Sequence, residues 1–487
     1  MSLGNRVLIS AIWVTASKWS VRLISIASTI ILARILVPND FGVVASVSLV
    51  VNLLSIMAET GTASYLIRIK NITNAHYDTA WTINLLARAA IGLIIYFGAH
   101  QLAVFYNNEH LEAAWKVMAL VAFINGFLNI GLIKVKKDLQ HHKIFIQETV
   151  TKVFGFVSTI SLSFLYMDYW GMIYGSLATG VVEVIVSYLV SSYRPTVCFE
   201  GFKAQWDFSK WILLTNISGF TRQKMDQMLV SKTLGVELMG YYSMATDISS
   251  LPAEFVYPTM GPIYSGYADL LDRESELNNA FITVIGVISV LSFPLYLGLF
   301  YLSEELVTLI LGPKWLTISE LIQIMSILIL MQILCTTFTG FLTVKGKVKL
   351  LTTLDWLFIF VLIPLLFFAS TFGSAVIIVV GRLIPYVFLS TALFFFTCTG
   401  VAGMAERIIS VAIRPMLAGL LMPILLFQIH PYIADLNIGL NIAINVALGA
   451  FFYSLIIWLL WIMVGRKEGG ERFILAKLGL LLNRRRK

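Results

Sequence analysis

The chain has 487 residues, of which 58% are hydrophobic and only 13% are charged, and its mean hydropathy is +0.84. A soluble domain has roughly 45–50% apolar and about 25% charged residues, so this composition excludes a soluble globular protein. The net charge of +8 comes mainly from connections between apolar segments, so we expect no nucleic-acid partner.

Apolar segments recur from one end of the chain to the other, each long enough to cross a hydrocarbon core of about 30 Å. No cleavable signal peptide is expected, because the apolar stretch after Arg6 is long and lacks a small-residue cleavage site. The sequence therefore predicts an all-α polytopic membrane protein with about fourteen transmembrane helices. In chain order, the predicted spans are 9–35, 41–63, 78–104, 113–133, 147–167, 171–192, 210–233, 240–265, 279–301, 316–341, 350–370, 373–397, 408–429 and 440–464.

The N-terminal and central parts of the sequence share a pattern at an offset of 198 residues. In each copy an apolar helix ends in a base and a leucine, and a glycine follows before the next apolar helix. Internal repeats of this kind are typical of transporters, so we expect two repeat-related bundles around a central cavity. The residues of the pattern are Arg34, Leu36 and Gly42 in the first copy and Lys232, Leu234 and Gly240 in the second.

The repeat and the spans together predict the domain organisation. We expect an N-terminal helical bundle over 1–195 and a second, repeat-related bundle over 196–400. An additional C-terminal helix pair covers 401–465, and a basic cytoplasmic tail covers 466–487.

Basic residues in the connections between predicted spans fall mostly on one side of the membrane. Because cytoplasmic loops carry an excess of Lys and Arg, we expect this side to face the cytoplasm. An even number of spans then places both termini in the cytoplasm. The basic connections contain Arg68, Lys70, Lys134, Lys136, Lys137, Lys143, Arg194, Lys203, Arg273, Lys345, Lys347, Lys349 and Arg407.

The sequence contains no pattern typical of a metal site. Cys198, Cys335 and Cys398 are scattered, without the spacing of a metal site or a persuasive disulfide. His141 and His142 are adjacent, so on a helix their side chains point about 100° apart. We therefore predict no metal and no cofactor.

Catalytic motifs are missing as well. The nearest approach to a nucleotide-binding loop, from Gly340 to Gly346 and Lys347, has the wrong spacing and no following Ser or Thr. A membrane glycosyltransferase, polymerase or ligase would usually carry a sizeable outer loop with catalytic residues, and every predicted outer connection is short. We therefore predict that the protein is not an enzyme.

Ionisable residues inside the predicted spans are the main functional signal. A charge at the bilayer centre costs about 2.5–3.5 kcal/mol on insertion scales, so such residues face a bundle interior or a wet cavity. We take the bases Arg88, Arg382, Lys18, Arg22 and Lys224 as candidates for binding substrate in the cavity. The candidates for ion coupling are the acids Glu59, Asp226, Asp247 and Glu254. The other charges within spans are Glu148, Lys152, Glu183, Arg222, Asp355 and Arg414.

Two of these bases lie deepest in their spans. Arg88 and Arg382 either line the cavity or pair with an in-membrane acid such as Glu183. Several other charges lie near enough to an interface for their side chains to snorkel toward water. This alternative applies to Lys18, Glu148, Asp355 and Arg414.

The spacing of the charges adds a further argument. Lys18 and Arg22 are one helical turn apart, so they repel each other unless an anion lies between them. Arg222 and Asp226 have the same spacing and favour an intrahelical ion pair. The interior candidates are mainly basic, which suits a phosphate or an acidic sugar, because the planar guanidinium group binds phosphate oxygens in a bidentate manner.

Two further motifs are informative. The first runs from Ala33 to Gly42, and the second runs from Met225 to Gly235 and continues to Pro252. Both resemble the polysaccharide-transporter family, the bacterial O-antigen and colanic-acid type oligosaccharide flippases of the multidrug/oligosaccharidyl-lipid/polysaccharide exporter superfamily. The resemblance is strong in the first half of the chain and rests mainly on span count and length in the remainder.

The resemblance implies a flippase that works by alternating access in the bacterial inner membrane. Its implied substrate is an undecaprenyl-pyrophosphate-linked oligosaccharide repeat unit for capsule, exopolysaccharide or O-antigen biosynthesis. The implied partners are this lipid-linked anionic oligosaccharide, the membrane lipids and a polysaccharide polymerase complex. Energy would come from an ion gradient or from substrate consumption.

Other functions remain open at this point. A small-cation or drug antiporter of the same superfamily would have about twelve spans and an acid-rich interior. A membrane polysaccharide polymerase or ligase would have a large outer loop. A relative that flips the peptidoglycan lipid precursor would also need a basic cavity.

Overall fold

The computed structural model describes residues 3–58, 61–62, 65–66, 69, 72–433, 436–465 and 469–473. Within these ranges the chain forms helices and connections and contains no β-strand. It divides into two compact units, Met1–Ser243 and Met244–Lys487. The candidate Glu59 and most of the basic tail lie outside the described residues.

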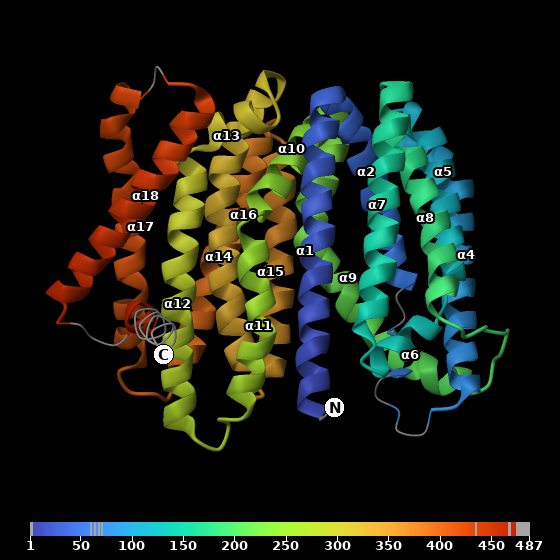
Figure 1. Cartoon of the computed structure of the whole chain (residues 1–487), viewed down its shortest axis with the longest axis horizontal. Coiled ribbons are helices and arrows are strands. Elements are labelled where there is room, and N and C mark those ends of the chain that lie inside the picture. The colour runs from blue at the N-terminus through green and yellow to red at the C-terminus, as the bar shows by residue number, and fades with distance from the viewer. Residues whose placement is uncertain are drawn as a thin grey trace. The chain divides into compact units, whose positions relative to one another are not determined.

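Long helices that run side by side form the N-terminal unit (Figure 1). Each begins and ends close to a predicted span, because runs of apolar residues can satisfy their backbone groups only within a helix. The helices are α1 (Leu3–Ile35), α2 (Pro38–Ala58), α4 (Asn74–Phe105), α5 (His110–Ile124), the 3-10 helix η1 (Asn125–Phe127), α6 (Gly131–Lys137), α7 (His141–Tyr166), α8 (Trp170–Val190) and α9 (Phe202–Thr233), followed by α10 (Val236–Ser250), which continues into the second unit.

Within this unit, α7 packs against both α1 and α8, and α5 packs against α2, α4 and α8. The core between α2, α4 and α5 contains Val47, Ile95 and Trp115, all fully buried. Burying an aliphatic or Phe side chain of this kind contributes about 1.5–3 kcal/mol, so this core holds the three helices together. Helix α9 packs on α2, where the buried hydroxyls of Ser46 and Ser231 lie 2.6 Å apart.

The fourth predicted span, 113–133, is bent. Helix α5 with η1 meets α6 at an angle of 57°. Asn129 stabilises the bend, because its side-chain oxygen accepts a hydrogen bond of 2.8 Å from the Gly131 amide and its side-chain nitrogen donates one of 2.8 Å to the Tyr193 carbonyl. The bend therefore ties α6 to the connection that follows α8.

The two glycines of the repeated pattern lie against each other's helices. A Cβ atom at Gly42 would lie well under 3.0 Å from the carbonyl oxygen of Val236, and one at Gly240 would lie equally close to that of Pro38. Pro38 and Val236 are themselves separated by the offset of the repeat. The starts of α2 and α10 therefore approach each other through a reciprocal contact, in which each copy of the pattern touches the other at equivalent positions.

The second unit is also built from long helices, several of which contain proline. They are α11 (Ala253–Ala268), α12 (Glu274–Tyr301), α13 (Ser303–Ile310), the 3-10 helix η2 (Pro313–Ile318), α14 (Ser319–Val344), α15 (Val348–Ser370), α16 (Ala375–Cys398), α17 (Met404–Ile433) and α18 (Ile438–Met463).

Helix α14 is central in this unit, where it packs against α11, α12, α15 and α16. The last two long helices form a pair, since α17 packs against both α12 and α18. Four packed pairs of the N-terminal unit recur here between helices of matching order. The pairs α2–α5, α4–α5, α5–α8 and α7–α8 correspond to α11–α14, α12–α14, α14–α16 and α15–α16.

Eleven helices of the described chain are long and apolar enough to cross a membrane, or twelve when the bent pair is counted as one span. The chain is therefore a multi-pass membrane protein. Two of the fourteen predicted spans, 210–233 and 240–265, do not form a helix that is long and apolar enough to cross a membrane. Helix α9 carries several charged residues along its length, and the predicted span 240–265 is wrong as a single helix, because it is divided between α10 and α11 at Leu251 and Pro252.

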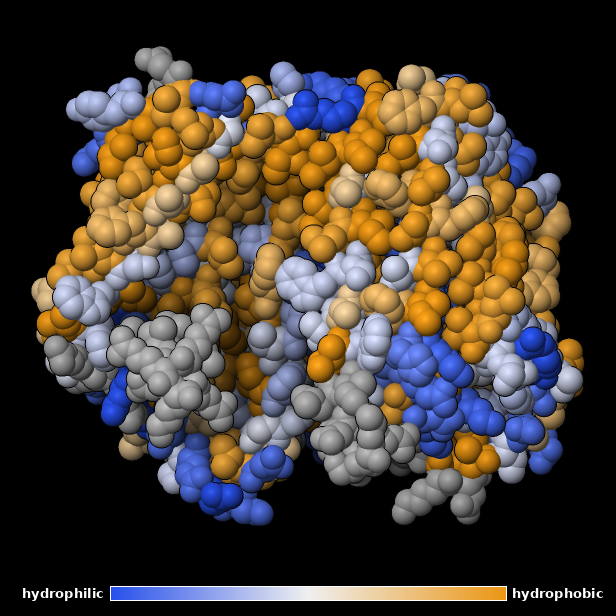
Figure 2. Space-filling model, viewed as in Figure 1, coloured by the Kyte–Doolittle hydropathy of each residue, from blue (hydrophilic) through white to orange (hydrophobic). Residues whose placement is uncertain are grey.

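The surface of the N-terminal unit agrees with a membrane location. On the face drawn in Figure 2, hydrophobic side chains cover the region of α7 and α8, and hydrophilic residues gather at the end that holds α6. Exposed apolar residues along α7 and α8 include Phe154, Val157, Ile185 and Leu189. An apolar surface of this extent on a monomer indicates contact with lipid.

Residues 469–473, which follow α18, pack into the second unit. The Gly470 backbone lies against Gly286 of α12, where a Cβ atom at Gly286 would be 2.8 Å from the Gly470 nitrogen. This close approach brings Glu471 to Arg414 of α17, with 3.3 Å between Oε1 and Nη1 and side-chain exposures of 6% and 2%. The alternative that Arg414 snorkels to an interface is therefore wrong. Burial raises the pKa of the Glu471 carboxyl, and the charge of Arg414 opposes this effect.

Candidate functional site

A polar pocket of about 260 Å³ lies inside the N-terminal unit, between α1, α5, α7 and α8. Its surroundings are apolar helices, so its polar lining is unusual for a membrane-embedded bundle. Polar or charged side chains line it from α1, α7, α8 and η1, namely Ser28, Asn125, Lys152, Thr159, Ser176, Thr179 and Glu183, and α5 contributes Val121.

Charged groups of both signs surround this pocket. Lys152 of α7 and Glu183 of α8 line it directly. Arg22 of α1 acts electrostatically on Lys152, and Arg88 of α4 acts on Glu183, so both lie near the pocket. Glu148, one helical turn before Lys152, also acts on Glu183. Three bases and two acids thus share one region of the unit.

Hydrogen bonding fixes one of these acids between two helices. The Ser17 hydroxyl of α1 donates a hydrogen bond to the Glu148 carboxylate of α7. Because α1 and α7 are extensively packed, this contact holds the charged face of α7 toward α1. Glu148 therefore has an internal role, and the snorkelling alternative for it is not supported.

Small residues allow α7 and α8 to pack closely next to the pocket. A Cβ atom at Gly155 would lie 2.7 Å from the Thr179 hydroxyl, and one at Gly175 would overlap Thr159. Small residues at this spacing let membrane helices approach each other, and Ser and Thr hydroxyls then reach across the interface. The pocket lies next to this close contact, and polar side chains of both helices line it.

One acceptor at the pocket has no partner within the described chain. The side-chain oxygen of Asn125, in η1, is buried and accepts no hydrogen bond there. A buried polar group of this kind costs free energy unless a water or ligand satisfies it. The pocket therefore combines an orphan acceptor, a carboxylate, several hydroxyls and the Lys152 ammonium, which are groups that can hold water or a proton. No group of three His, Cys, Asp or Glu residues suited to a metal occurs in the described ranges.

With this geometry in view, comparison with known proteins decides the family. Residues 31–320 match the family model described as "Polysaccharide biosynthesis protein", which covers more than half of the chain. The chain belongs to this family. The resemblance found in the two sequence motifs is thereby confirmed.

The chain is similar to named polysaccharide biosynthesis proteins of bacteria. The chain is 20% identical over 412 residues to the lipopolysaccharide biosynthesis protein WzxC of Escherichia coli strain K12, with 84% of each chain covered. It is 22% identical over 460 residues to the succinoglycan biosynthesis transport protein ExoT of Rhizobium meliloti strain 1021, with 92% of each covered.

The fold also has a solved counterpart. The structure of the lipid II flippase MurJ in an inward closed conformation superposes with a TM-score of 0.73 at 11% identity, covering 93% of this chain and 99% of that chain. At this level of identity the similarity establishes the fold. The family member described here therefore has the helical architecture of MurJ over nearly its whole length.

The basic residues predicted to bind substrate lie in several different places in this polysaccharide biosynthesis protein. Arg22 and Arg88 lie close to the polar pocket, as described above. Lys18 is exposed on α1, and Lys224 of α9 donates a hydrogen bond of 3.1 Å to the Gln227 side chain. Arg382 is in the second unit, on α16, with 7% of the residue exposed.

The acidic candidates have contrasting surroundings. Asp226 of α9 is 2% exposed and accepts a hydrogen bond of 2.5 Å from the Tyr242 hydroxyl of α10. Asp247 and Glu254 are exposed on α10 and α11. Asp226 is thus positioned as a link between two helices of the N-terminal unit.

Sequence reasoning recognised Lys152 and Glu183 as charges within spans but did not place them in the candidate site, and it missed Asn125. The spacing of Glu148 and Lys152 on one face of α7 was a usable signal, since a charged face must point inward in a membrane. The hydroxyl-bearing residues Thr159 and Thr179 strengthen the same signal. The sequence contains no comparable signal for Asn125, because its place in the pocket lining depends on the position of η1.

Proposed function

We propose that the protein is a flippase that moves undecaprenyl-pyrophosphate-linked oligosaccharide repeat units across the bacterial inner membrane by alternating access. Membership of the polysaccharide biosynthesis family is the observation that carries this proposal. The name of the related transport protein ExoT points the same way, as does the fold shared with the lipid II flippase MurJ. The product would be a capsule, an exopolysaccharide or an O-antigen.

The proposed architecture has fourteen crossings in two repeat-related bundles around a central cavity, with both termini in the cytoplasm. Recurrence of the same packed helix pairs in both units supports the repeat. The reciprocal glycine contact between α2 and α10 supports it as well. The uneven distribution of basic residues between alternate connections supports the orientation.

We further propose that basic side chains hold the pyrophosphate and acidic sugars of the substrate. The candidates are those predicted from the sequence, Arg88, Arg382, Lys18, Arg22 and Lys224. An arginine fork can bind two phosphate oxygens at once, which favours Arg over Lys for this role. The protein would act as a carrier and not as an enzyme, and it would deliver its substrate to a polysaccharide polymerase complex.

The first test is to measure undecaprenyl-pyrophosphate lipids, and the membrane face on which they lie, in cells that lack the protein. We expect complete, unpolymerised repeat units to accumulate on the cytoplasmic face, because synthesis continues while export stops. Mass spectrometry would identify the oligosaccharide in the same experiment. The absence of a build-up would favour a different exporter, and a build-up on the outer face would favour a polymerase or ligase.

We also propose that the polar pocket of the N-terminal unit couples transport to a proton, with Glu183 as the group that changes charge. In Glu183→Gln we expect the rate of export to fall about tenfold, since energetic coupling between sites is typically 1–3 kcal/mol. The measurement is surface polysaccharide per molecule of membrane-inserted protein, at two imposed pH gradients.

Two features make this test specific. Glu406→Gln is a matched control, because Glu406 is an exposed acid at the start of α17 in the other unit. In contrast to this control, Glu183→Gln should also lose the dependence of export on the pH gradient. Export by Glu183→Gln that keeps both its rate and its gradient dependence would remove the pocket from the coupling mechanism.

A further inference from the structure

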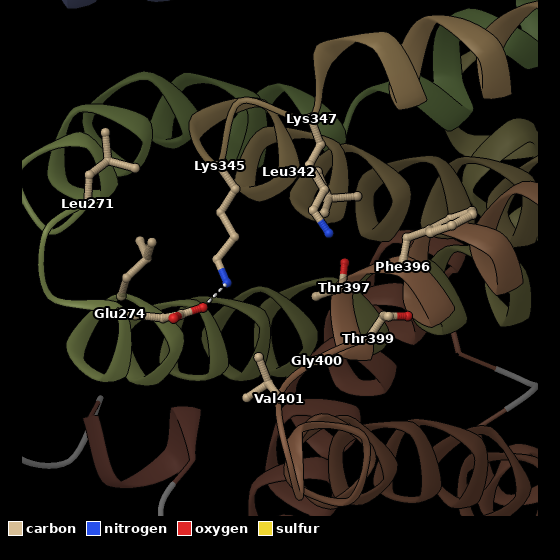
Figure 3. Close-up of a pocket in the computed structure, with 11 residues that line it drawn as sticks. Leu271, Glu274, Leu342, Lys345, Lys347, Phe396, Thr397, Thr399, Gly400 and Val401 are labelled. Carbon is tan, nitrogen blue, oxygen red and sulfur yellow. Dashed lines mark hydrogen bonds and ion pairs between the residues drawn. The ribbon is translucent and has the colours of Figure 1, made fainter.

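A second pocket, of about 350 Å³, lies wholly within the second unit (Figure 3). It forms where the start of α12, the turn between α14 and α15 and the end of α16 come together. Because α12, α14 and α16 are all long and apolar enough to cross a membrane, we expect their ends at the level of the lipid headgroups. The pocket is separate from the polar pocket of the N-terminal unit.

Two lysines give this pocket its charge. The Lys345 ammonium lies 3.1 Å from a Glu274 carboxylate oxygen and donates a hydrogen bond of 3.2 Å to the Asn278 side chain. Lys347, two residues later, lines the pocket and forms no ion pair with any residue that the structure describes. Two ammonium groups and one carboxylate leave the pocket with a net positive charge.

Glu274 does not close the pocket to an anion. Its side chain is 71% exposed, whereas that of Lys345 is 18% exposed. The carboxylate can therefore rotate into water at little cost, while the lysine, whose ammonium lies 4.9 Å from the centre of the Phe341 ring, keeps its position. An incoming anion would replace Glu274 as the partner of Lys345.

Thr397 provides a second and independent sign of a ligand. The residue is 2% exposed, and its hydroxyl has no hydrogen-bond partner within the described chain. In Figure 3 this hydroxyl points into the pocket, toward the Lys347 ammonium. A buried hydroxyl is normally hydrogen-bonded, so an acceptor from outside the chain is expected next to it.

We propose that this pocket binds a phosphate group, and that the group belongs to the headgroup of an anionic membrane lipid. Lys347 and Lys345 would neutralise the phosphate oxygens, and Thr397 would donate a hydrogen bond to one of them. Basic pockets between transmembrane helices are known to hold anionic headgroups. The apolar side chains of Leu271, Leu342 and Phe396 line the same pocket and would contact the acyl region.

The test is native mass spectrometry of the purified full-length protein with phosphatidylglycerol, phosphatidylcholine or inorganic phosphate as the probe. We expect phosphatidylglycerol to bind in preference to phosphatidylcholine. In Lys347→Gln its affinity should fall about tenfold, as for the loss of one hydrogen bond to a charged group. Lys349→Gln is the matched control, since Lys349 is exposed in the first turn of α15, two residues after Lys347, but does not line the pocket.

Thr397 variants keep the proposal testable if one of them folds poorly. Thr397→Val should weaken phosphatidylglycerol binding, and Thr397→Ser, which keeps the hydroxyl, should restore it. Equal binding of the two lipids, or equal loss in the Lys347 and Lys349 variants, would overturn the proposal. Saturable binding of inorganic phosphate that displaces no lipid would overturn the lipid as the source of the phosphate group.

Discussion

Gly42→Ala should prevent the protein from accumulating in the membrane in a folded form. A Cβ atom at this position would overlap the backbone carbonyl of Val236, and a backbone group cannot rotate away as the end of a side chain can. Overpacking usually costs about 1–3 kcal/mol, and overlap with the main chain lies at or above the upper end of that range. Gly240→Ala should have a comparable effect, because its Cβ atom would overlap the carbonyl of Pro38.

The measurement is the amount and thermal stability of fluorescently tagged protein in a single elution peak after detergent extraction. Gly98→Ala is the matched control, because Gly98 lies within α4 and has open space where its Cβ atom would be. Alanine there should leave stability unchanged or slightly higher, since it favours the helix. Wild-type levels of Gly42→Ala would mean that α2 and α10 do not need this close approach.

Removing one partner of the Arg414–Glu471 pair is the second substitution for which we expect a large effect. Glu471→Leu leaves the Arg414 guanidinium, which is 2% exposed, without its carboxylate. Breaking a buried ion pair in this way costs about 3–5 kcal/mol, so we expect a marked fall in the thermal midpoint of the detergent-solubilised protein.

A double substitution separates the charge from the packing. Replacing a buried pair by apolar residues is often nearly neutral, so Arg414→Met combined with Glu471→Leu should recover much of the lost stability. The exposed pair Arg273–Glu276, at 3.0 Å, is the control, and Arg273→Ala should change stability by about 0–1 kcal/mol. If Glu471→Leu were no more harmful than Arg273→Ala, residues 469–473 would not be firmly docked.

The sequence predicts the class of the protein and most of its helices, because the requirement for apolar spans is strong and local. It fails at Leu251 and Pro252, which interrupt the single helix predicted over 240–265. Hydropathy measures transfer into lipid and does not register a break in the backbone. The charged α9 is the opposite case, a helix of 32 residues that a measure of apolar length does not count.

The candidate site was predictable only in part, and for a physical reason. A charged residue within a predicted span is easy to recognise in a sequence, because its transfer into lipid costs free energy. Arg22, Arg88 and Glu183 were recognised in this way. Which of them share a pocket depends on how helices pack, and one sequence does not contain that information. Asn125 and Thr397 show the limit, because each matters through an unsatisfied polar atom that appears only once the neighbouring helices are in place.

The docking of residues 469–473 also bears on how the protein is made. Arg414 is synthesised 57 residues before Glu471. At about 5–20 residues per second, roughly 3–11 seconds pass between the addition of Arg414 and the addition of Glu471 to the chain. During that interval Arg414 lacks the carboxylate with which it pairs in the folded protein. A chain that terminated just before Glu471 would keep every helix through α18 and yet carry this defect permanently.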